Sequence, residues 1–325
     1  MAGLFQVFFW LSRDNLVTLN ENSFEKIESL SYSPFEGYDK NLLSSEQIAY
    51  DVNLFENFTN KLRTYGTLEA YKILQSSKDS NLPIDLGLWI GGDLEANNLE
   101  IQRALEILKE YPNRIQSVIV GNEVLLRKEL EPLELYAYID FMKSHTKKPV
   151  TTAETWDIWE KNPQLASHVD FLTIHILPYW EKVPIERYNE FIIEKYSVVE
   201  ELFPNRKIVI GETGWPSHGY NNNSAIPSIK NQAQAIRGFV NLAHEKGWHY
   251  NIIEALDQPW KGYDEGNVGQ YWGIFTTDRA LKFQLAGEVE LNKYWLYQMI
   301  AAIIIGALLT IFGLKNQRVN ISHAF

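Results

Sequence analysis

Short apolar segments alternate along this chain with longer segments of helical periodicity, and this alternation restricts the possible folds more than any other feature. Where the pattern is helical, apolar residues recur three and four positions apart, as Ile48, Val52 and Phe55 do, which is the spacing of one buried helix face. Strands that alternate with helices form parallel sheets with helical connections. Strands are predicted at residues 27–33, 61–65, 84–90, 115–120, 149–153, 171–176, 207–210 and 250–255.

These strand–helix units follow one another without a linker and predict an α/β fold, a single (β/α)8 TIM barrel over residues 27–290. An open nucleotide-binding sheet would carry a glycine-rich turn after its first strand, whereas residues 32–35 read Tyr-Ser-Pro-Phe. Ser44 and Gln47 resemble a capping box at the start of a helix. The candidate for the last helix, at residues 282–292, is short and leads directly into a more apolar segment.

That apolar segment, residues 294–314, carries no charge over 21 positions. A helix of this length spans about 31 Å, the thickness of a bilayer core. Tyr294, Trp295 and Tyr297 stand where interfacial aromatic residues are common, and a short basic tail, residues 315–325, follows the segment. We therefore expect a C-terminal transmembrane helix with its tail in the cytoplasm and the body of the protein on the periplasmic or extracellular side. A buried helix of a soluble protein is the alternative.

Residues 1–26 are expected to form a lead-in to the barrel. Their apolar run of about ten residues is too short to span a bilayer, and no basic residue precedes it. This run leaves three readings open, namely a degenerate export signal, the remnant of a longer anchor and an amphipathic segment.

Charge and composition exclude several classes of function. The formal net charge is −11, and residues 291–325 contain three basic residues and no acidic one, so the preceding part carries 27 basic against 41 acidic side chains. Such an acidic body repels phosphate backbones, and no nucleic acid is expected as a partner. The chain has no cysteine, which excludes thiol nucleophiles and thiolate metal sites.

Two of the predicted strands end in a glycine that is followed closely by a carboxylate. Residues 118–123 read Val-Ile-Val-Gly-Asn-Glu and residues 208–212 read Ile-Val-Ile-Gly-Glu. Glu123 and Glu212 therefore stand at the carboxyl ends of the fourth and seventh strands, where the reacting groups of TIM barrels lie. Two carboxyl groups that face one cleft, one protonated and one ionised, are the apparatus of glycoside hydrolysis.

Other strand ends and the loops after them supply side chains that can bind a sugar. Arginine, tyrosine and histidine can hydrogen-bond a carboxylate, and aromatic rings can stack on the apolar faces of sugar rings. An oligosaccharide cleft is therefore favoured over a small-molecule pocket. From the residues alone, the candidates are Arg63, Tyr65, Trp89, His175, Tyr179, Trp180, Trp215, Trp260 and Trp272.

No cofactor and no metal site is predicted. The Gly-x-Ser-x-Gly and Walker patterns are absent from the sequence. His244 and His249 lack the spacing of a helical zinc pair, and no acidic run has the pattern of a calcium-binding loop.

Two motifs resemble the signatures of glycoside hydrolase family 17, the β-1,3-glucanase family. They are residues 120–124, Val-Gly-Asn-Glu-Val, and residues 211–217, Gly-Glu-Thr-Gly-Trp-Pro-Ser. Residues 31–35, 173–180 and 254–261 look like the bacterial branch of that family, in which the barrel is often joined through membrane spans to a module that makes β-glucan. The resemblance covers nearly the whole predicted barrel.

The resemblance implies a retaining reaction, with Glu123 as general acid/base and Glu212 as nucleophile, and hence carboxyl groups about 5–5.5 Å apart. It also implies that Asn122 binds the sugar 2-hydroxyl, and it adds Tyr32 and Lys261 to the substrate-binding candidates. Where plant members of the family carry a further glutamate, this chain has Gln258. Substrate-binding details of the plant enzymes therefore do not transfer directly.

The sequence as a whole predicts a membrane-anchored retaining glycosidase or transglycosidase that acts on β-1,3-glucan, with a membrane glucan synthase as a candidate partner. Whether the acceptor is water or another glucan is left open. The alternative from another class is a catalytically silent glucan-binding accessory subunit of a membrane β-glucan synthase. Intact Glu123 and Glu212 weigh against it, because a binding module gains little from a like-charged pair.

Overall fold

The computed structural model of the protein describes residues 16–19, 26–290 and 294–321. It divides into two compact units, one within Glu21–Ala286 and one formed by the two ends of the chain. The apolar run near the N-terminus lies outside the described residues, so the three readings of it stay open.

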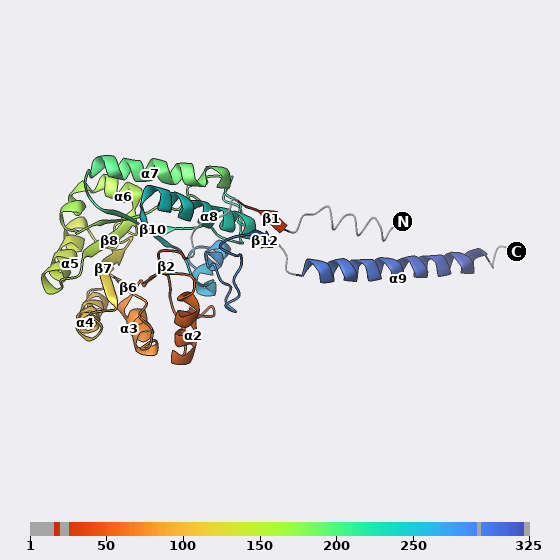
Figure 1. Cartoon of the computed structure of the whole chain (residues 1–325), viewed down its shortest axis with the longest axis horizontal. Helices are drawn as coiled ribbons and strands as arrows, with labels where there is room; N and C mark the ends of the chain where they lie inside the picture. Colours follow the sequence, from red (N-terminus) through yellow and green to blue (C-terminus); the bar gives the residue numbers. More distant parts are fainter. Residues whose placement is uncertain (1–15, 20–25, 291–293, 322–325) are drawn as a thin grey trace. The chain divides into compact units, whose positions relative to one another are not determined.

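Eight parallel strands close into a barrel in the larger unit, which confirms the predicted fold (Figure 1). Around the barrel the strands follow the order β10-β11-β2-β5-β6-β7-β8-β9. Each of them overlaps one of the predicted strand segments. The strands are β2 (Leu30–Ser31), β5 (Leu62–Arg63), β6 (Ile84–Leu88), β7 (Ile115–Asn122), β8 (Val150–Thr155), β9 (Leu172–His175), β10 (Ile208–Thr213) and β11 (His249–Ile252).

Helices connect successive strands and surround the barrel (Figure 1). In the first of them the Ser44 side chain accepts a hydrogen bond from the Gln47 N–H at 3.2 Å, which is one half of the predicted capping box, whereas the Gln47 side chain donates to Asp51 at 2.9 Å. Ile48, Val52 and Phe55 form its buried face. The α-helices are α2 (Ser45–Phe55), α3 (Thr67–Ser76), α4 (Leu94–Glu110), α5 (Pro132–His145), α6 (Trp156–Lys161), α7 (Tyr188–Leu202) and α8 (Ile229–Lys246), and two 3₁₀ helices, η1 (Pro163–Ser167) and η2 (Ile185–Arg187), lie between α6 and α7.

The barrel closes at the seam between its last and first strands. Ile252 in β11 pairs in parallel with Leu30 in β2. Two short 3₁₀ helices, η3 (Pro259–Gly262) and η4 (Asn267–Tyr271), follow β11. Backbone hydrogen bonds also join this region to the strand ends, for example from Ala255 N–H to Ser31 O at 2.9 Å.

The prediction of a last helix at residues 282–292 is wrong. The described part of this stretch consists of turns followed by the short strand β12 (Glu288–Glu290). Gly287 has a φ of +79°, a left-handed conformation that a right-handed helix does not contain.

The smaller unit pairs the two ends of the chain. β1 (Leu16–Thr18) lies antiparallel to β12, with Leu16 opposite Glu290. Helix α9 (Trp295–Ile321) follows, and Trp295–Gly313 has a mean hydropathy of 2.1 with none of its residues buried. By length and composition this helix could cross a membrane, so the predicted span at residues 294–314 coincides with a helix of suitable character.

Candidate active site

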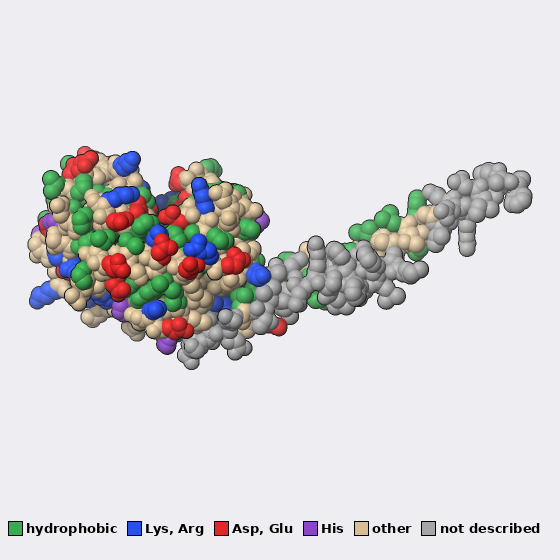
Figure 2. All heavy atoms as spheres, turned by 90° about the horizontal axis from the view of Figure 1, so that it is seen from above, with side chains coloured by type: hydrophobic (Ala, Val, Ile, Leu, Met, Phe, Trp, Pro, Cys, Tyr) green, Lys and Arg blue, Asp and Glu red, His purple; other side chains and the backbone are tan. Residues whose placement is uncertain are grey.

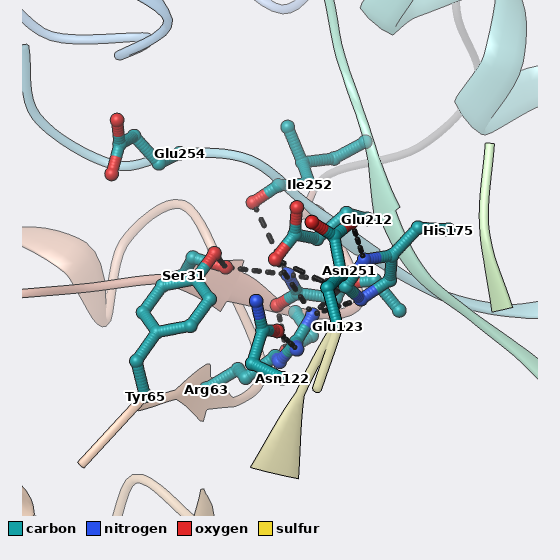
Figure 3. A network of polar contacts seen from close by, with 12 residues as sticks. Ser31, Arg63, Tyr65, Asn122, Glu123, His175, Glu212, Asn251, Ile252 and Glu254 are labelled. Carbon is teal, nitrogen blue, oxygen red and sulfur yellow. Dashed lines mark hydrogen bonds and ion pairs between the residues drawn. The ribbon is translucent and has the colours of Figure 1, made fainter. Parts of the chain in front are cut away.

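Both predicted glutamates stand where their strand departs from regular pairing. In β7 the register with β8 shifts between Ile119 and Asn122, directly before Glu123. In β10 the register with β9 shifts between Ile210 and Glu212. Such irregularities change the direction in which a side chain points, and they bring both carboxylates to the same end of the barrel (Figure 3).

The glycines before the two glutamates are required by close packing. A Cβ at Gly121 would lie 2.5 Å from Val124 Cγ2, and a Cβ at Gly211 would lie 2.4 Å from Thr173 Cγ2. Gly121 also has a φ of +84°. Glu123 itself has a φ of +54°, and its N–H donates to Ala153 O at 2.7 Å. The glycines thus give the strand ends room to turn.

His175 joins the two carboxylates. Its Nδ1 lies 2.7 Å from Glu123 Oε1, and its Nε2 lies 3.7 Å from Glu212 Oε1. One carboxylate oxygen of each glutamate and a ring nitrogen of the histidine lie within 4.8 Å of one another. Figure 3 shows these three side chains converging from different strands.

Arg63 supplies a buried positive charge beneath this cluster. It is 2% exposed, and its Nη1 lies 3.3 Å from Glu212 Oε1. Its Nη2 donates to Asn122 Oδ1 at 2.6 Å, and its Nη1 also donates to Gly211 O. A guanidinium suits this position because it can serve several acceptors in fixed directions at once. Arg63 therefore holds Glu212 and Asn122 in one arrangement.

The environment of Glu123 favours its ionised form. Burial opposes the charge of this carboxyl group, but the hydrogen bond from His175 and the charges of His175, Arg63 and Arg127 outweigh burial and lower the pKa of Glu123. An acid catalyst has to carry a proton, so its protonation depends on the bound substrate or on its partner His175.

Three further acids lie near the pair and were not predicted from the sequence, of which Glu154 and Glu254 are buried and Glu265 is half-buried. Burial raises the pKa of Glu154 and of Glu254 to about 7, while Glu265 has its pKa raised by burial and by the charges of Glu212 and Glu123. Glu154 comes directly after Ala153, the predicted end of its strand, so the strand-end rule could have identified it. Glu265 lies in a loop without a sequence signal.

Two cavities meet at Glu123 and Glu212. A cavity of about 680 Å³ and a cavity of about 420 Å³ are both lined by Glu123, Glu212, Ile253 and Glu265. Figure 2 shows the barrel unit hollowed at its upper edge in that view. Among the predicted residues, the larger cavity contacts Tyr65, Trp89, Asn122, Trp260 and Lys261, and the smaller one contacts His175, Trp180 and Trp272.

Each cavity has aromatic walls. In the smaller cavity Trp180 and Trp272 stack with ring centroids 5.9 Å apart. In the larger cavity Trp89 and Trp260 each carry a cation above the ring, Arg127 at 4.4 Å and Lys40 at 4.2 Å. Both cavities are therefore lined by aromatic side chains together with polar and charged ones.

The loop after β11 places Lys261 and Trp260 at the larger cavity. Lys261 Nζ lies 2.9 Å from Glu254 Oε1, and both side chains are buried. Gln258, at the position where the plant enzymes carry a glutamate, accepts a hydrogen bond from Trp260 Nε1 at 2.6 Å and donates to Ser33 O at 3.0 Å. Gln258 thus orients Trp260.

Besides Arg63, which lies beneath the glutamates, three predicted substrate-binding residues lie in the core and line neither cavity. The Tyr32 hydroxyl donates to Asp51 at 2.9 Å. The Tyr179 hydroxyl donates to Tyr220 O at 2.6 Å. Trp215 is fully buried and donates from Nε1 to Ile226 O. Each of these polar groups is already paired within the protein.

Glu123, His175 and Glu212 offer the donor atoms that a metal ion could use. The guanidinium of Arg63, 3.3 Å from Glu212, already provides a positive charge at this point. The expectation that neither metal nor cofactor takes part stays a prediction.

Comparisons with known proteins agree with this geometry. Residues 29–273 match the family model of the BtgE/BtgC glycoside hydrolase domain. A glucan 1,3-beta-glucosidase of Schizosaccharomyces pombe is 27% identical over 255 residues, which cover 72% of this chain and 79% of that protein. A protein of the same name in Saccharomyces cerevisiae is 24% identical, with 74% of this chain and 85% of that protein covered.

Solved structures are similar in fold. An active-site mutant of Rhizomucor miehei beta-1,3-glucanosyltransferase in complex with laminaritriose has a TM-score of 0.72 and 25% identity, and the match covers 79% of this chain and 95% of that one. An endo-laminarinase from Formosa has a TM-score of 0.68 at 21% identity, with 81% of this chain and 86% of that chain covered.

Proposed function

Since this chain belongs to the BtgE/BtgC glycoside hydrolase family, we propose that it cleaves β-1,3-glucan by double displacement with retention of configuration. The observation that carries the proposal is the pair Glu123 and Glu212, whose nearest carboxylate oxygens lie within 4.8 Å of each other. Retaining enzymes hold the two carboxyl groups about 5–5.5 Å apart, whereas inverting enzymes leave about 6.5–9.5 Å for a water molecule. The short separation therefore favours direct attack by one carboxylate.

In the first step Glu212 attacks the anomeric carbon, and the bond from that carbon to the glycosidic oxygen breaks. Glu123 gives its proton to the departing oxygen. Arg63 holds Glu212 in place before the attack, because its guanidinium lies 3.3 Å from that carboxylate. A glycosyl ester of Glu212 results.

In the second step an acceptor hydroxyl attacks the same carbon and the ester bond to Glu212 breaks. Glu123, now ionised, takes the proton of the acceptor and returns to its starting state. The catalytic residues are therefore restored without any cofactor.

The proton on Glu123 is supplied when substrate is bound. In the free protein His175 and nearby cations lower the pKa of this carboxyl group. A sugar that fills both cavities excludes water from the site, and exclusion of water favours the neutral form of a carboxyl group. His175, 2.7 Å away, keeps this carboxyl group in position.

The substrate chain extends on both sides of the bond that is cleaved. Support for this comes from the two cavities, which share Glu123 and Glu212 but otherwise have different walls. Both cavities have aromatic walls. The cavity that receives the acceptor is therefore aromatic in either orientation of the glucan chain. A saccharide acceptor can therefore compete with water, and we infer that transfer accompanies hydrolysis.

Helix α9 is proposed to anchor the enzyme in a membrane. The basic residues Lys315 and Arg318 follow the apolar segment, which favours a cytoplasmic tail and a body on the periplasmic or extracellular side. A membrane glucan synthase is a fitting partner in this arrangement, since its product would be available at the same surface.

The test is product analysis with linear β-1,3-gluco-oligosaccharides and the full chain in a mild detergent. Shorter products with retained configuration are expected, together with products longer than the input from transfer. The variant Glu212→Gln should lose turnover and keep glucan binding, whereas Glu201→Gln, an exposed glutamate on α7, should match the wild type.

Two results would contradict the proposal. Turnover by the Glu212→Gln variant would remove Glu212 as the nucleophile. Glucan binding by the wild type without any product would instead support the accessory subunit.

A further inference from the structure

Two tyrosines next to the larger cavity are exposed to solvent and packed against each other. Tyr38 is 59% exposed and Tyr263 is 74% exposed. Their ring centroids lie 6.3 Å apart with the ring planes at 74°. Exposed aromatic rings of this size leave apolar surface in water, which is unfavourable unless something covers it.

The two tyrosines come from loops that are far apart in the sequence. Tyr38 lies in the turn of a hairpin formed by β3 (Phe35–Glu36) and β4 (Asn41–Leu42). Tyr263 directly follows η3. Their proximity therefore depends on contacts between the hairpin and the loop after β11.

Those contacts lie directly beneath the tyrosines and fix the two loops to each other. Phe35 packs edge-on against Trp260, with ring centroids 6.4 Å apart. The ammonium group of Lys40 lies 5.0 Å from the centre of the Phe35 ring and 4.2 Å from that of Trp260. A cation over an aromatic face is attractive, so Lys40 links both loops. The tyrosine pair is thus formed before any ligand binds.

The same residues connect the tyrosine pair to the catalytic site. Phe35, Lys40, Trp260 and Asp264 line the larger cavity, which also contacts Glu123 and Glu212. Tyr38 lies between Phe35 and Lys40 in the sequence, and Tyr263 immediately precedes Asp264. A glucan chain that leaves the cavity over this part of the cavity wall meets the two tyrosines.

The chemistry of the pair suits a neutral sugar chain. A tyrosine offers an apolar face together with a hydroxyl group, and Asp39 and Asp264 stand next to the pair as exposed acceptors for sugar hydroxyls. Within the cavity, by contrast, one face of Trp260 is already covered by Lys40. The two tyrosines offer a ligand more open aromatic surface than Trp260 does.

We propose that Tyr38 and Tyr263 form a distal glucan-binding subsite that holds the part of a β-1,3-glucan chain that extends beyond the larger cavity. This inference rests on the proposed function and adds a preference for long chains to it. The subsite contributes to binding of long substrates and leaves the chemistry at Glu212 unchanged.

The test compares kcat/KM for a trisaccharide with kcat/KM for chains of about ten glucose units. The full chain is used in mild detergent, as the wild type, as Tyr38→Ala/Tyr263→Ala and as Tyr38→Phe/Tyr263→Phe. The alanine variant should lose about tenfold in kcat/KM on the long chains, through KM, and nothing on the trisaccharide. The phenylalanine variant should keep most of the preference for long chains. Tyr50→Ala removes a tyrosine that is 57% exposed on α2 and serves as the control.

The outcomes separate this inference from the proposed function. No turnover of any glucan by the wild type would contradict the proposed function itself. Turnover by the wild type with the same dependence on chain length in all variants would overturn the subsite. If the alanine variant instead changed the sedimentation of the protein and left that dependence intact, the tyrosines would belong to a contact between copies of the chain.

Discussion

His175 Nδ1 lies 2.7 Å from Glu123 Oε1, so the proposed acid of the reaction is hydrogen-bonded to an imidazole before substrate arrives. The other ring nitrogen faces Glu212 at 3.7 Å. One histidine therefore contacts both carboxyl groups whose protonation states the reaction has to keep apart. The pH dependence of the enzyme should reflect this arrangement.

Replacing His175 by Gln is expected to move the basic limb of the kcat/KM profile to higher pH. The glutamine can still donate a hydrogen bond but carries no charge, so one cause of the lowered pKa of Glu123 disappears and this pKa rises. Because Glu123 has to be protonated, its proton is then retained to higher pH. A basic limb that moves to lower pH would show that His175, and not Glu123, holds the limiting proton.

Replacing Glu123 by Gln should impair glucan cleavage far more than cleavage of aryl glucosides with good leaving groups. A good leaving group needs little protonation, so the loss of the acid matters less; on glucan a loss of about 10²–10⁴-fold is the ordinary contribution of such a catalyst. Single-turnover rates on the two substrate classes measure the difference. Equal losses on both would remove Glu123 as the acid.

Stability should decrease as the pH rises from about 4.5 to about 7. Burial raises the pKa of Glu154 and Glu254 from 4.5 to about 7, so over this range the folded protein keeps protons that the unfolded chain releases. Glu154→Gln should make the pH dependence of the free energy of unfolding less steep, as measured by urea denaturation. The control is Glu201→Gln, at an exposed glutamate, which should leave the pH dependence of the free energy of unfolding unchanged. An unaltered slope in the Glu154 variant would mean that this carboxyl group is ionised throughout.

Truncation after Glu290 should release a folded and active body that needs no detergent. The deletion removes the apolar helix α9 and leaves the closed barrel and the strand β12 in place. Detergent-free solubility, thermal unfolding and kcat/KM of the truncated chain are compared with those of the full chain. Aggregation of the truncated chain would indicate that α9 covers apolar surface of the body and does not serve as an anchor.

The barrel could be predicted because each of its strands leaves a short apolar run between helical segments. That Glu123 and Glu212 lie together could be predicted because each follows such a run closely. The last helix could not, because the conformation of Gly287 and the pairing of β12 with β1 depend on residues at opposite ends of the chain. Pairing over such a separation leaves no local pattern in the sequence.

The walls of the site were harder to predict than its centre. Tyr32, Tyr179 and Trp215 stand beside functional positions in the sequence, but their side chains are buried in the core. Trp156 and Lys40 line the cavities without having been predicted to do so. Sequence position identifies the end of a strand, whereas the direction of a side chain in the following loop depends on how that loop packs.

At Glu123 the backbone conformation lowers the stability of the fold, whereas the side chain is needed for the proposed reaction. Its φ of +54° belongs to the conformation that glycine adopts freely and that costs other residues about 1–2 kcal/mol. A laboratory selection for heat resistance alone should therefore drift toward glycine at this position and discard the proposed acid. Only a screen that also rewards turnover should keep the glutamate, which makes this position a sensitive indicator of what any such selection has acted on.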